Sequence, residues 1–104
     1  MKIVKVTYAA KTDFVNQNQN NIKLVMADLQ TFNYPGINYN ACLSEDGKTF
    51  IHTAFFKSDE DQKLLNDLNS FKNFQQQLKL HGLETPPQQE LISLIGSSTS
   101  IFNS

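Results

Sequence analysis

The sequence contains no arginine and no tryptophan, and it has a single cysteine, Cys42. Without arginine it lacks the planar guanidinium group that usually binds phosphate or carboxylate through two hydrogen bonds. A single cysteine excludes an internal disulfide and suits a reducing compartment. The formal net charge of −1 gives no indication of binding to nucleic acid or to an anionic membrane surface. We therefore expect a cytoplasmic protein that binds neither nucleic acid nor membrane.

Several motifs that carry common chemistries are also missing. No Cys-x-x-Cys or His-x-x-x-His spacing indicates a metal site, and no glycine-rich loop is suited to phosphate. No serine lies in a recognisable nucleophile elbow. No apolar run is long enough for a signal peptide or a membrane span. We expect neither a metal nor a cofactor.

Length and composition predict one domain. A chain of 104 residues buries roughly 65% of the surface that it exposes when unfolded, which is enough for an independent core. We place the domain at residues 1–96. Residues 97–104 then form a short Ser-rich tail, whose Ile101 and Phe102 suggest that it still packs against the domain.

The stretch from Gly36 to Phe56 predicts a β-hairpin. Two alternating runs flank Asp46-Gly47, a dipeptide suited to the two positive-φ positions of a type I′ turn. With this turn Leu43 lies opposite Phe50. One face of the hairpin is then mainly apolar and should meet helices. It comprises Ile37, Tyr39, Ala41, Leu43, Phe50, His52, Ala54 and Phe56.

A strand and a helix are predicted before the hairpin. Residues 2–10 alternate like a strand, with Val4, Val6 and Tyr8 on one side. Thr12 or Asp13 is suited to cap a helix that runs to about Phe32. The apolar stripe of this helix comprises Phe14, Ile22, Val25, Leu29 and Phe32, and Asn18 falls inside it. The Asn-Gln run at 16–21 indicates polar helix surface, unless it reflects only a genomic bias in codons.

A second helix and a last strand follow the hairpin. Ser58 is a plausible N-cap, and the helix should end near Gly82. Its apolar stripe comprises Leu64, Leu68, Phe71, Phe74 and Leu78, with Gln75 near the middle. The fourth strand is expected over residues 91–95, ending near Gly96.

The order of these elements is βαββαβ, with a tight hairpin in the middle. Right-handed crossovers give an α+β, ferredoxin-like fold with antiparallel sheet order 4-1-3-2 and both helices on one face. The opposite face carries Ile3, Ile51 and Phe55, which is too apolar to leave in water. A second copy of the chain is the simplest cover.

Five features carry a resemblance to a known family. They are the opening strand, Pro35-Gly36, the Asp46-Gly47 hairpin, Phe50–Phe56 leading into Ser58-Asp59-Glu60, and Phe71-x-x-Phe74 before a glycine and a final strand. In order and spacing the chain resembles the antibiotic-biosynthesis monooxygenase superfamily of dimeric α+β barrels.

The resemblance implies a homodimer, a dimeric α/β barrel in which two sheets face each other. It also implies a pocket in each subunit between the sheet and its own helices. Members of the superfamily include cofactor-independent oxygenases and haem-degrading enzymes. The haem-degrading members use a histidine on the second helix, and this chain has none there before His81. Haem degradation is therefore not expected.

The predicted fold directs several polar side chains into the layer between sheet and helices. Tyr8, Asn18, His52 and Gln75 should approach one another, with Tyr39 on the same face but further away. We predict a small-molecule site there, in which His52 is the catalytic acid or base and the other four bind the ligand.

Each of these residues also has a purely structural explanation. A histidine on an apolar face is often a hydrogen-bonded core residue, and tyrosines often pack with only the hydroxyl reaching an edge. Two functions therefore remain open. The protein binds a small apolar or aromatic molecule, with monooxygenase- or isomerase-type chemistry, or it is a non-catalytic dimeric module with a closed pocket. A cavity that reaches His52 would favour the first.

Overall fold

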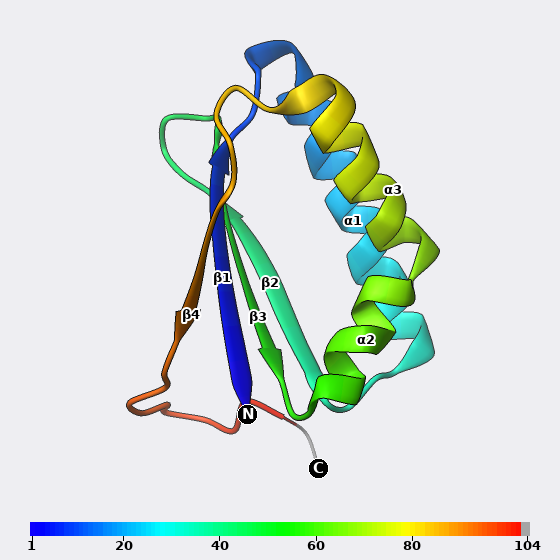
Figure 1. The fold of residues 1–104 in the computed structure, drawn as a ribbon, viewed down its shortest axis with the longest axis vertical. Coiled ribbons are helices and arrows are strands. Elements are labelled where there is room, and N and C mark those ends of the chain that lie inside the picture. Colours follow the sequence, from blue (N-terminus) through cyan, green and yellow to red (C-terminus); the bar gives the residue numbers. More distant parts are fainter. Residues whose placement is uncertain (103–104) are drawn as a thin grey trace.

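The computed structural model describes residues 1–102, in which four strands are covered by helices on one side (Figure 1). The elements are β1 (Lys2–Ala9), a 3₁₀ turn (Thr12–Phe14), α1 (Val15–Phe32), β2 (Ile37–Leu43), β3 (Thr49–Phe56), α2 (Asp59–Asp67), α3 (Asn69–Gln77), a π-helical turn (Leu78–Gly82) and β4 (Gln88–Ile92).

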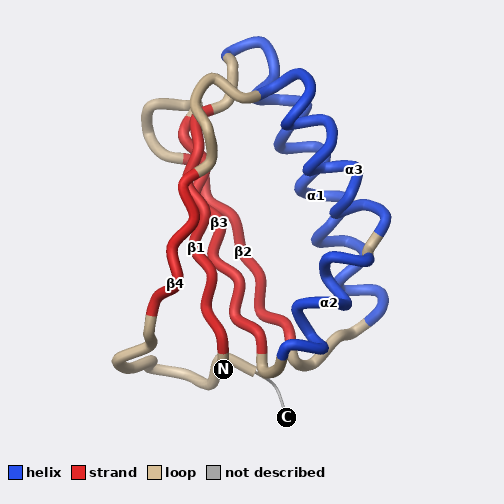
Figure 2. The backbone as a smooth tube through the Cα atoms, viewed as in Figure 1, coloured by secondary structure: helices blue, strands red, loops and turns tan. Residues whose placement is uncertain are grey.

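The strands form one antiparallel sheet in the order β2-β3-β1-β4. This is the predicted order 4-1-3-2 read from the other edge, so the ferredoxin-like α+β prediction is confirmed. The helices lie together on one face of the sheet (Figure 2). The hairpin register is also as predicted, with Leu43 opposite Phe50 and Ala41 opposite His52.

The turn of this hairpin differs from the prediction. Gly47 has a φ of 77°, whereas Asp46 is not in the positive-φ region, so the turn is not type I′. The Asp46 carboxylate instead accepts hydrogen bonds from the Thr49 hydroxyl and from the backbone N–H groups of Lys48 and Thr49. These bonds lower the pKa of Asp46 to about 2. The register survives because the Ser44 N–H still donates to the Thr49 carbonyl at 2.8 Å.

Helix α1 follows the prediction at its C-terminus but not at its start. No side chain caps its first turns, so the expected capping by Thr12 or Asp13 is wrong. At the other end Asn33 adopts a left-handed conformation with φ 53° and donates its N–H to Leu29. Phe32 is 53% exposed and does not belong to the apolar stripe, whereas Asn21 is buried despite the polar run around it.

The predicted second helix is two helices. Ser58 caps α2 as expected, since its hydroxyl accepts from the Asp61 N–H at 3.3 Å. Leu68 is extended, with ψ 126°, and separates α2 from α3. This non-helical residue shifts the phase of the two apolar stripes. Leu65 is buried in α2 in place of the predicted Leu64, which is 40% exposed.

Strand β4 lies three residues earlier than predicted. Residues Gln88–Ile92 pair with Thr7–Ile3 of β1, and Leu94 and Ile95 lie beyond the strand. All five residues of β4 are exposed, because this edge strand has one neighbour and lies outside the helical cover. Burial does not mark its position in the sequence, so the apolar run at 91–95 was misleading.

The core lies between the sheet and the helices. Its buried members from the sheet are Val4, Tyr8, Phe50, Ala54 and Phe56. The helical layer, with the residue that joins α2 to α3, contributes Phe14, Val15, Ile22, Val25, Leu65, Leu68, Phe71, Phe74 and Leu78. Aromatic rings from both layers meet in this core, and Tyr8 stacks on Phe50 with ring centroids 5.4 Å apart. The candidate site residues on the sheet, Tyr8, Tyr39 and His52, therefore lie against this core.

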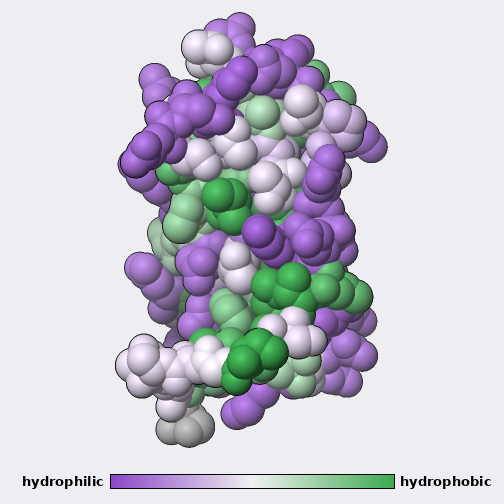
Figure 3. Space-filling view, turned by 90° about the vertical axis from the view of Figure 1, so that its left-hand side faces the viewer, coloured by the Kyte–Doolittle hydropathy of each residue, from purple (hydrophilic) through white to green (hydrophobic). Residues whose placement is uncertain are grey.

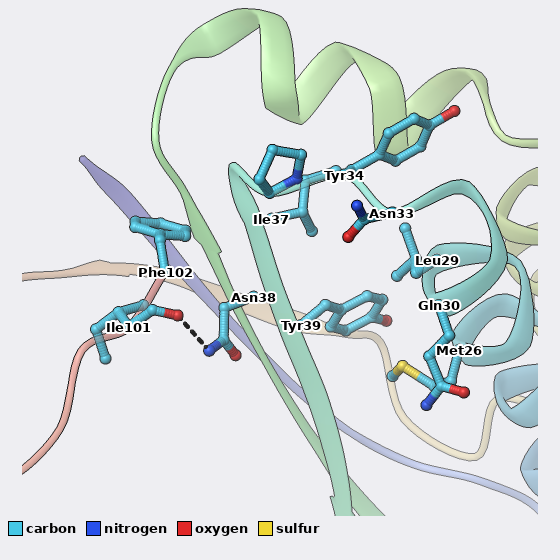
Figure 4. Close-up of a pocket in the computed structure, with 11 residues that line it drawn as sticks. Met26, Leu29, Gln30, Asn33, Tyr34, Ile37, Asn38, Tyr39, Ile101 and Phe102 are labelled. Atoms are coloured by element: carbon cyan, nitrogen blue, oxygen red, sulfur yellow. Dashed lines mark hydrogen bonds between the residues drawn. The ribbon is translucent and has the colours of Figure 1, made fainter. Parts of the chain in front are cut away.

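The tail crosses the face of the sheet that the helices leave open. The side-chain amide of Asn38 donates to the Ile101 carbonyl at 2.8 Å, on the side of β2 away from the helices (Figure 4). The register aligns Ile92, Ile3, Phe55 and Asn38 in one row across the sheet. The tail therefore runs from one end of this row to the other. Ile3, which lies within the row, is only 4% exposed. Residues 103–104 of the predicted tail lie outside the described residues.

Candidate functional site

His52 lies at the centre of a hydrogen-bonded cluster on the helix-facing side of the sheet. Its Nε2 is 2.8 Å from the Tyr8 hydroxyl, and its Nδ1 is 2.6 Å from the Tyr39 hydroxyl. The register explains this geometry. Within the sheet Val6 and Ala41 stand directly opposite His52, so each tyrosine is its diagonal neighbour on a flanking strand, within reach of a long side chain.

Asn18 extends the cluster into α1. Its Nδ2 donates to the Tyr8 hydroxyl at 2.9 Å, and the side chain is completely buried. Its Oδ1 has no hydrogen-bond partner among the described residues. Buried polar atoms are normally paired, because an unpaired one costs about 1–3 kcal/mol. The unpaired Oδ1 of Asn18 therefore lowers the free energy of unfolding.

With the Asn18 amide oriented as a donor to Tyr8, the hydrogen bonds of the cluster run in one direction. Since Asn18 donates to the Tyr8 oxygen, the Tyr8 proton is free to be donated to His52 Nε2. Nδ1 then carries the imidazole proton and donates it to the Tyr39 oxygen. The sequence of donation is Asn18 to Tyr8 to His52 to Tyr39, and the Tyr39 proton remains available for a further acceptor.

Burial keeps all three titratable groups neutral at pH 7. It lowers the pKa of His52 to about 4, because the imidazolium form would lose its hydration. It also raises the pKa of Tyr8 well above its ordinary value, although the hydrogen bond from Asn18 acts in the opposite direction. Burial likewise raises the pKa of Tyr39, with a smaller effect from Tyr8. Tyr8, His52 and Tyr39 therefore form a hydrogen-bonded series of uncharged groups, which we call the neutral relay.

A cavity of about 440 Å³ opens beside this cluster. Tyr8, Tyr39 and His52 line it, together with Val6, Phe71, Phe74, Leu78 and Leu83. The Phe74 ring stacks on His52 with centroids 5.3 Å apart, and the edge of Phe71 meets Tyr39. The exposed members of the lining form the mouth, between the α3 end and β4. They are Gln75, Lys79, Pro87 and Gln89.

The five predicted site residues take different places in this arrangement. Tyr8, His52 and Tyr39 line the cavity, and Tyr39 is closer to His52 than expected. Asn18 lies behind Tyr8 and does not line the cavity, so it can act only by positioning that hydroxyl. Gln75 is exposed at the mouth and makes no hydrogen bond to the cluster.

Sequence reasoning missed the other polar residues of the mouth. Gln89 belongs to β4, whose position was predicted incorrectly, and its place opposite Val6 follows only from the observed register. Lys79 was not among the predicted site residues. A helical wheel would have placed it next to Gln75, one turn earlier, as a neighbour at i,i+4.

Tyr39 also borders a second, separate crevice of about 300 Å³ around the edge of β2. Figure 4 shows its ring between β2 and the Met26 and Leu29 side chains of α1, with Ile101 and Phe102 of the tail beyond the strand. The polar part of this crevice comes from amide and hydroxyl groups. It contains no titratable side chain other than the two tyrosines, Tyr34 and Tyr39.

Comparison with solved structures places this fold among known proteins. A Nitrosomonas europaea protein provisionally named an antibiotic biosynthesis monooxygenase is similar, with a TM-score of 0.77 and 14% identity over 92% of this chain and 100% of that one. The fold is that of the antibiotic biosynthesis monooxygenase-like proteins. A Mycobacterium tuberculosis protein is similar at a TM-score of 0.76 and 12% identity over 94% and 98% of the two chains.

Other comparisons agree at the level of the fold. A Bacteroides thetaiotaomicron protein with the same provisional name has a TM-score of 0.76 and 10% identity, over 95% of this chain and 93% of that one. No family model and no curated protein sequence matches the chain. The resemblance inferred from element order and spacing is therefore confirmed for the antibiotic biosynthesis monooxygenase-like fold. At these sequence identities the structural similarity supports a shared fold and not a shared activity.

Two further properties bear on the site. Within residues 1–102, no group of three or more His, Cys, Asp or Glu side chains lies close enough to hold a metal ion. No helix in the same range has the length and apolar character needed to cross a bilayer.

Proposed function

We propose that the protein binds a small apolar or aromatic molecule in the cavity beside His52, which we call the His52 cavity, and transfers a proton to or from it. The observation that carries this proposal is a histidine with both ring nitrogens paired to tyrosines at the wall of a largely apolar cavity of about 440 Å³. Small-molecule sites commonly combine such a volume with few convergent polar groups.

The chemistry follows from the neutral relay. A ligand oxygen placed at Tyr39 accepts the one hydroxyl proton that the cluster leaves unused. As negative charge develops on that oxygen, the Tyr39 hydroxyl stabilises it by donating a hydrogen bond, and the His52 Nδ1–H donates to the Tyr39 oxygen in turn. Tyr8 and Asn18 hold the imidazole in the orientation that this donation needs. A carbonyl or phenolic ligand fits this role, in an isomerisation or, with dioxygen as co-substrate, an oxygenation.

The alternative is a non-catalytic module whose pocket is filled by its own side chains. Phe50, Phe56, Phe71 and Phe74 are buried and could have closed the layer. The cavity that reaches His52 favours a binding site over a closed core. Tyr39 is partly buried and belongs to the lining of this cavity, which supports contact between its side chain and a ligand.

His52→Phe and Tyr39→Phe test this function. A panel of bicyclic aromatic compounds with and without a carbonyl or hydroxyl oxygen is screened by thermal shift and native mass spectrometry. We expect oxygen-bearing members to stabilise the native protein, and both variants to lose this effect while remaining folded. Tyr34→Phe is the matched control, because Tyr34 lies outside the His52 cavity. A panel without any binder would leave the non-catalytic module as the better description.

We also propose that two copies pair through the open face of the sheet. Ile51 and Phe55 remain partly exposed there, and Ile92 of β4, on the same face of the sheet, is 40% exposed. Leu94 and Ile95, just beyond β4, are further large apolar residues that are exposed. Apolar surface gathers in the lower half of the molecule when it is viewed from the β4 side (Figure 3).

Native mass spectrometry tests the pairing directly, and a doubled mass at micromolar concentration is expected. Cys42 provides a second measurement, since it is exposed on this face of β2. Its alkylation should slow as protein concentration rises. A single-chain mass, with alkylation independent of concentration, would contradict the homodimer.

A further inference from the structure

The mouth of the His52 cavity has an uneven charge. Lys79 is the one charged side chain in the lining, and no Asp or Glu lines it. Within residues 1–102 Lys79 forms no ion pair, in common with every lysine except Lys48, which pairs with Glu84 at 3.0 Å. What distinguishes Lys79 is its place at the rim of the cavity, with no carboxylate beside it in the lining.

The local backbone places this lysine where it can meet a ligand. Helix α3 ends in a π-helical turn, Leu78–Gly82, closed by a hydrogen bond from the Leu83 N–H to the Leu78 carbonyl at 3.1 Å. Such widened turns are rare and often occur at functional sites. Leu78 is buried in the cavity wall, and Lys79 follows it at the rim. Two uncharged amides, those of Gln75 and Gln89, stand on the two sides of the opening and offer N–H donors.

From this arrangement we propose that the ligand is an aromatic acid, held with its anionic group at Lys79 and its ring against His52, Phe71 and Phe74. This inference rests on the proposed function, since it divides the same cavity into an anion-binding mouth and an aromatic interior. The mouth supplies an ammonium group and amide donors, and the interior supplies ring faces and the Tyr39 hydroxyl. The Lys79 ammonium group can bind a carboxylate as a point charge, without the bidentate fork of arginine, which this chain lacks.

The test compares 2-naphthoate with 2-naphthamide, which share one ring system and differ in charge. Binding is measured by the fluorescence of the naphthalene ring, for the native protein and for two variants. Lys79→Gln removes the charge at the mouth. Lys72→Gln is the matched control, because Lys72 is also exposed on α3 but does not line the cavity.

We expect the native protein and Lys72→Gln to bind the acid about five- to tenfold more tightly than the amide, as for a partly exposed charged hydrogen bond. Lys79→Gln should lose this preference and keep its affinity for the amide. Added salt should weaken binding of the acid and leave the amide unaffected, because it screens the exposed charge.

The possible outcomes distinguish a failure of the anion site from a failure of the proposed function. Equal binding of acid and amide by the native protein, or a preference that survives in Lys79→Gln, overturns the anion site and leaves the aromatic cavity standing. Failure of both compounds, and of the oxygen-bearing panel, overturns the cavity as a binding site and the anion site with it.

Discussion

The Tyr39 hydroxyl lies 2.6 Å from Nδ1 of His52, although the two residues stand on different strands and are not directly opposed in the sheet. With Tyr8 on Nε2, both nitrogens of the imidazole are occupied by phenols. The histidine therefore has no free nitrogen to offer a ligand. Any proton that it exchanges with the cavity passes through a tyrosine, and Tyr39 is the one whose proton is unused.

The tautomer of His52 is the first prediction. Donation from Asn18 through Tyr8 requires Nε2 to be the unprotonated nitrogen and Nδ1 to carry the proton. Nitrogen-15 NMR on a His81→Gln background, where His52 is the sole histidine, should report this tautomer and no titration between pH 8 and pH 5. An imidazolium signal at pH 6 would contradict the buried, neutral relay.

Stability should depend on acid pH through His52. Its folded pKa of about 4 is below the ordinary value of 6.5, so the unfolded chain binds the proton more readily. The stabilisation is fully present above pH 6.5 and is lost as pH falls through 4, by about 3 kcal/mol in the free energy of unfolding. Urea unfolding at several pH values should show this loss in the His81→Gln protein.

The same measurement on His52→Phe provides the comparison. Without the imidazole, that part of the pH dependence should vanish, so the difference between the two curves should change by about 3 kcal/mol between pH 7 and pH 4. Curves that stay parallel from pH 7 to pH 4 would show that His52 is not buried as a neutral group.

Asn18→Leu separates positioning from stability. The substitution removes one hydrogen bond, worth about 0.5–1.5 kcal/mol, but it also removes the buried Oδ1 that has no partner among the described residues. The free energy of unfolding should change by less than about 1.5 kcal/mol, while His52 loses its single tautomer in the NMR spectrum. Asn20→Leu, on the exposed side of α1, should leave that spectrum unchanged. A tautomer unaffected by Asn18→Leu would remove Asn18 from the relay.

Gly82→Ala should destabilise the fold. A Cβ atom at this position would overlap the ring of Phe14, which packs against the end of the π-helical turn. The expected cost is about 1–3 kcal/mol in urea unfolding, as for overpacking of a core. Gly96→Ala is the matched control, since its Cβ would meet open space. Equal stability of the two variants would show that Phe14 moves aside freely.

The sheet was predictable because alternation and turn chemistry act locally. The hairpin around Asp46-Gly47 fixes which residues oppose one another, and this alone placed His52 on the face that meets the helices. The turn type was not predictable, because the Asp46 side chain accepts backbone hydrogen bonds that compete with a type I′ geometry.

The helices and the edge strand show where local patterns stop being informative. Nothing in the sequence marks Leu68 as extended, and that break decides that Leu65 and not Leu64 is buried. Strand β4 has no buried residue, so its register depends on pairing with β1 rather than on hydrophobicity. The candidate site likewise contains residues that local patterns predict and residues that depend on long-range pairing. Tyr8 and Asn18 followed from strand and helix faces, whereas Gln89 depended on β4.

The unpaired oxygen of Asn18 has a consequence for the polarity of the cavity. Rotation of this amide by 180° places Oδ1 at the Tyr8 hydroxyl, which then donates to Asn18 and accepts from His52 Nε2. The imidazole switches tautomer, and Tyr39 donates to Nδ1 and turns a lone pair toward the ligand. One amide rotation thus converts the cavity from a donor for a carbonyl oxygen into an acceptor for a hydroxyl group.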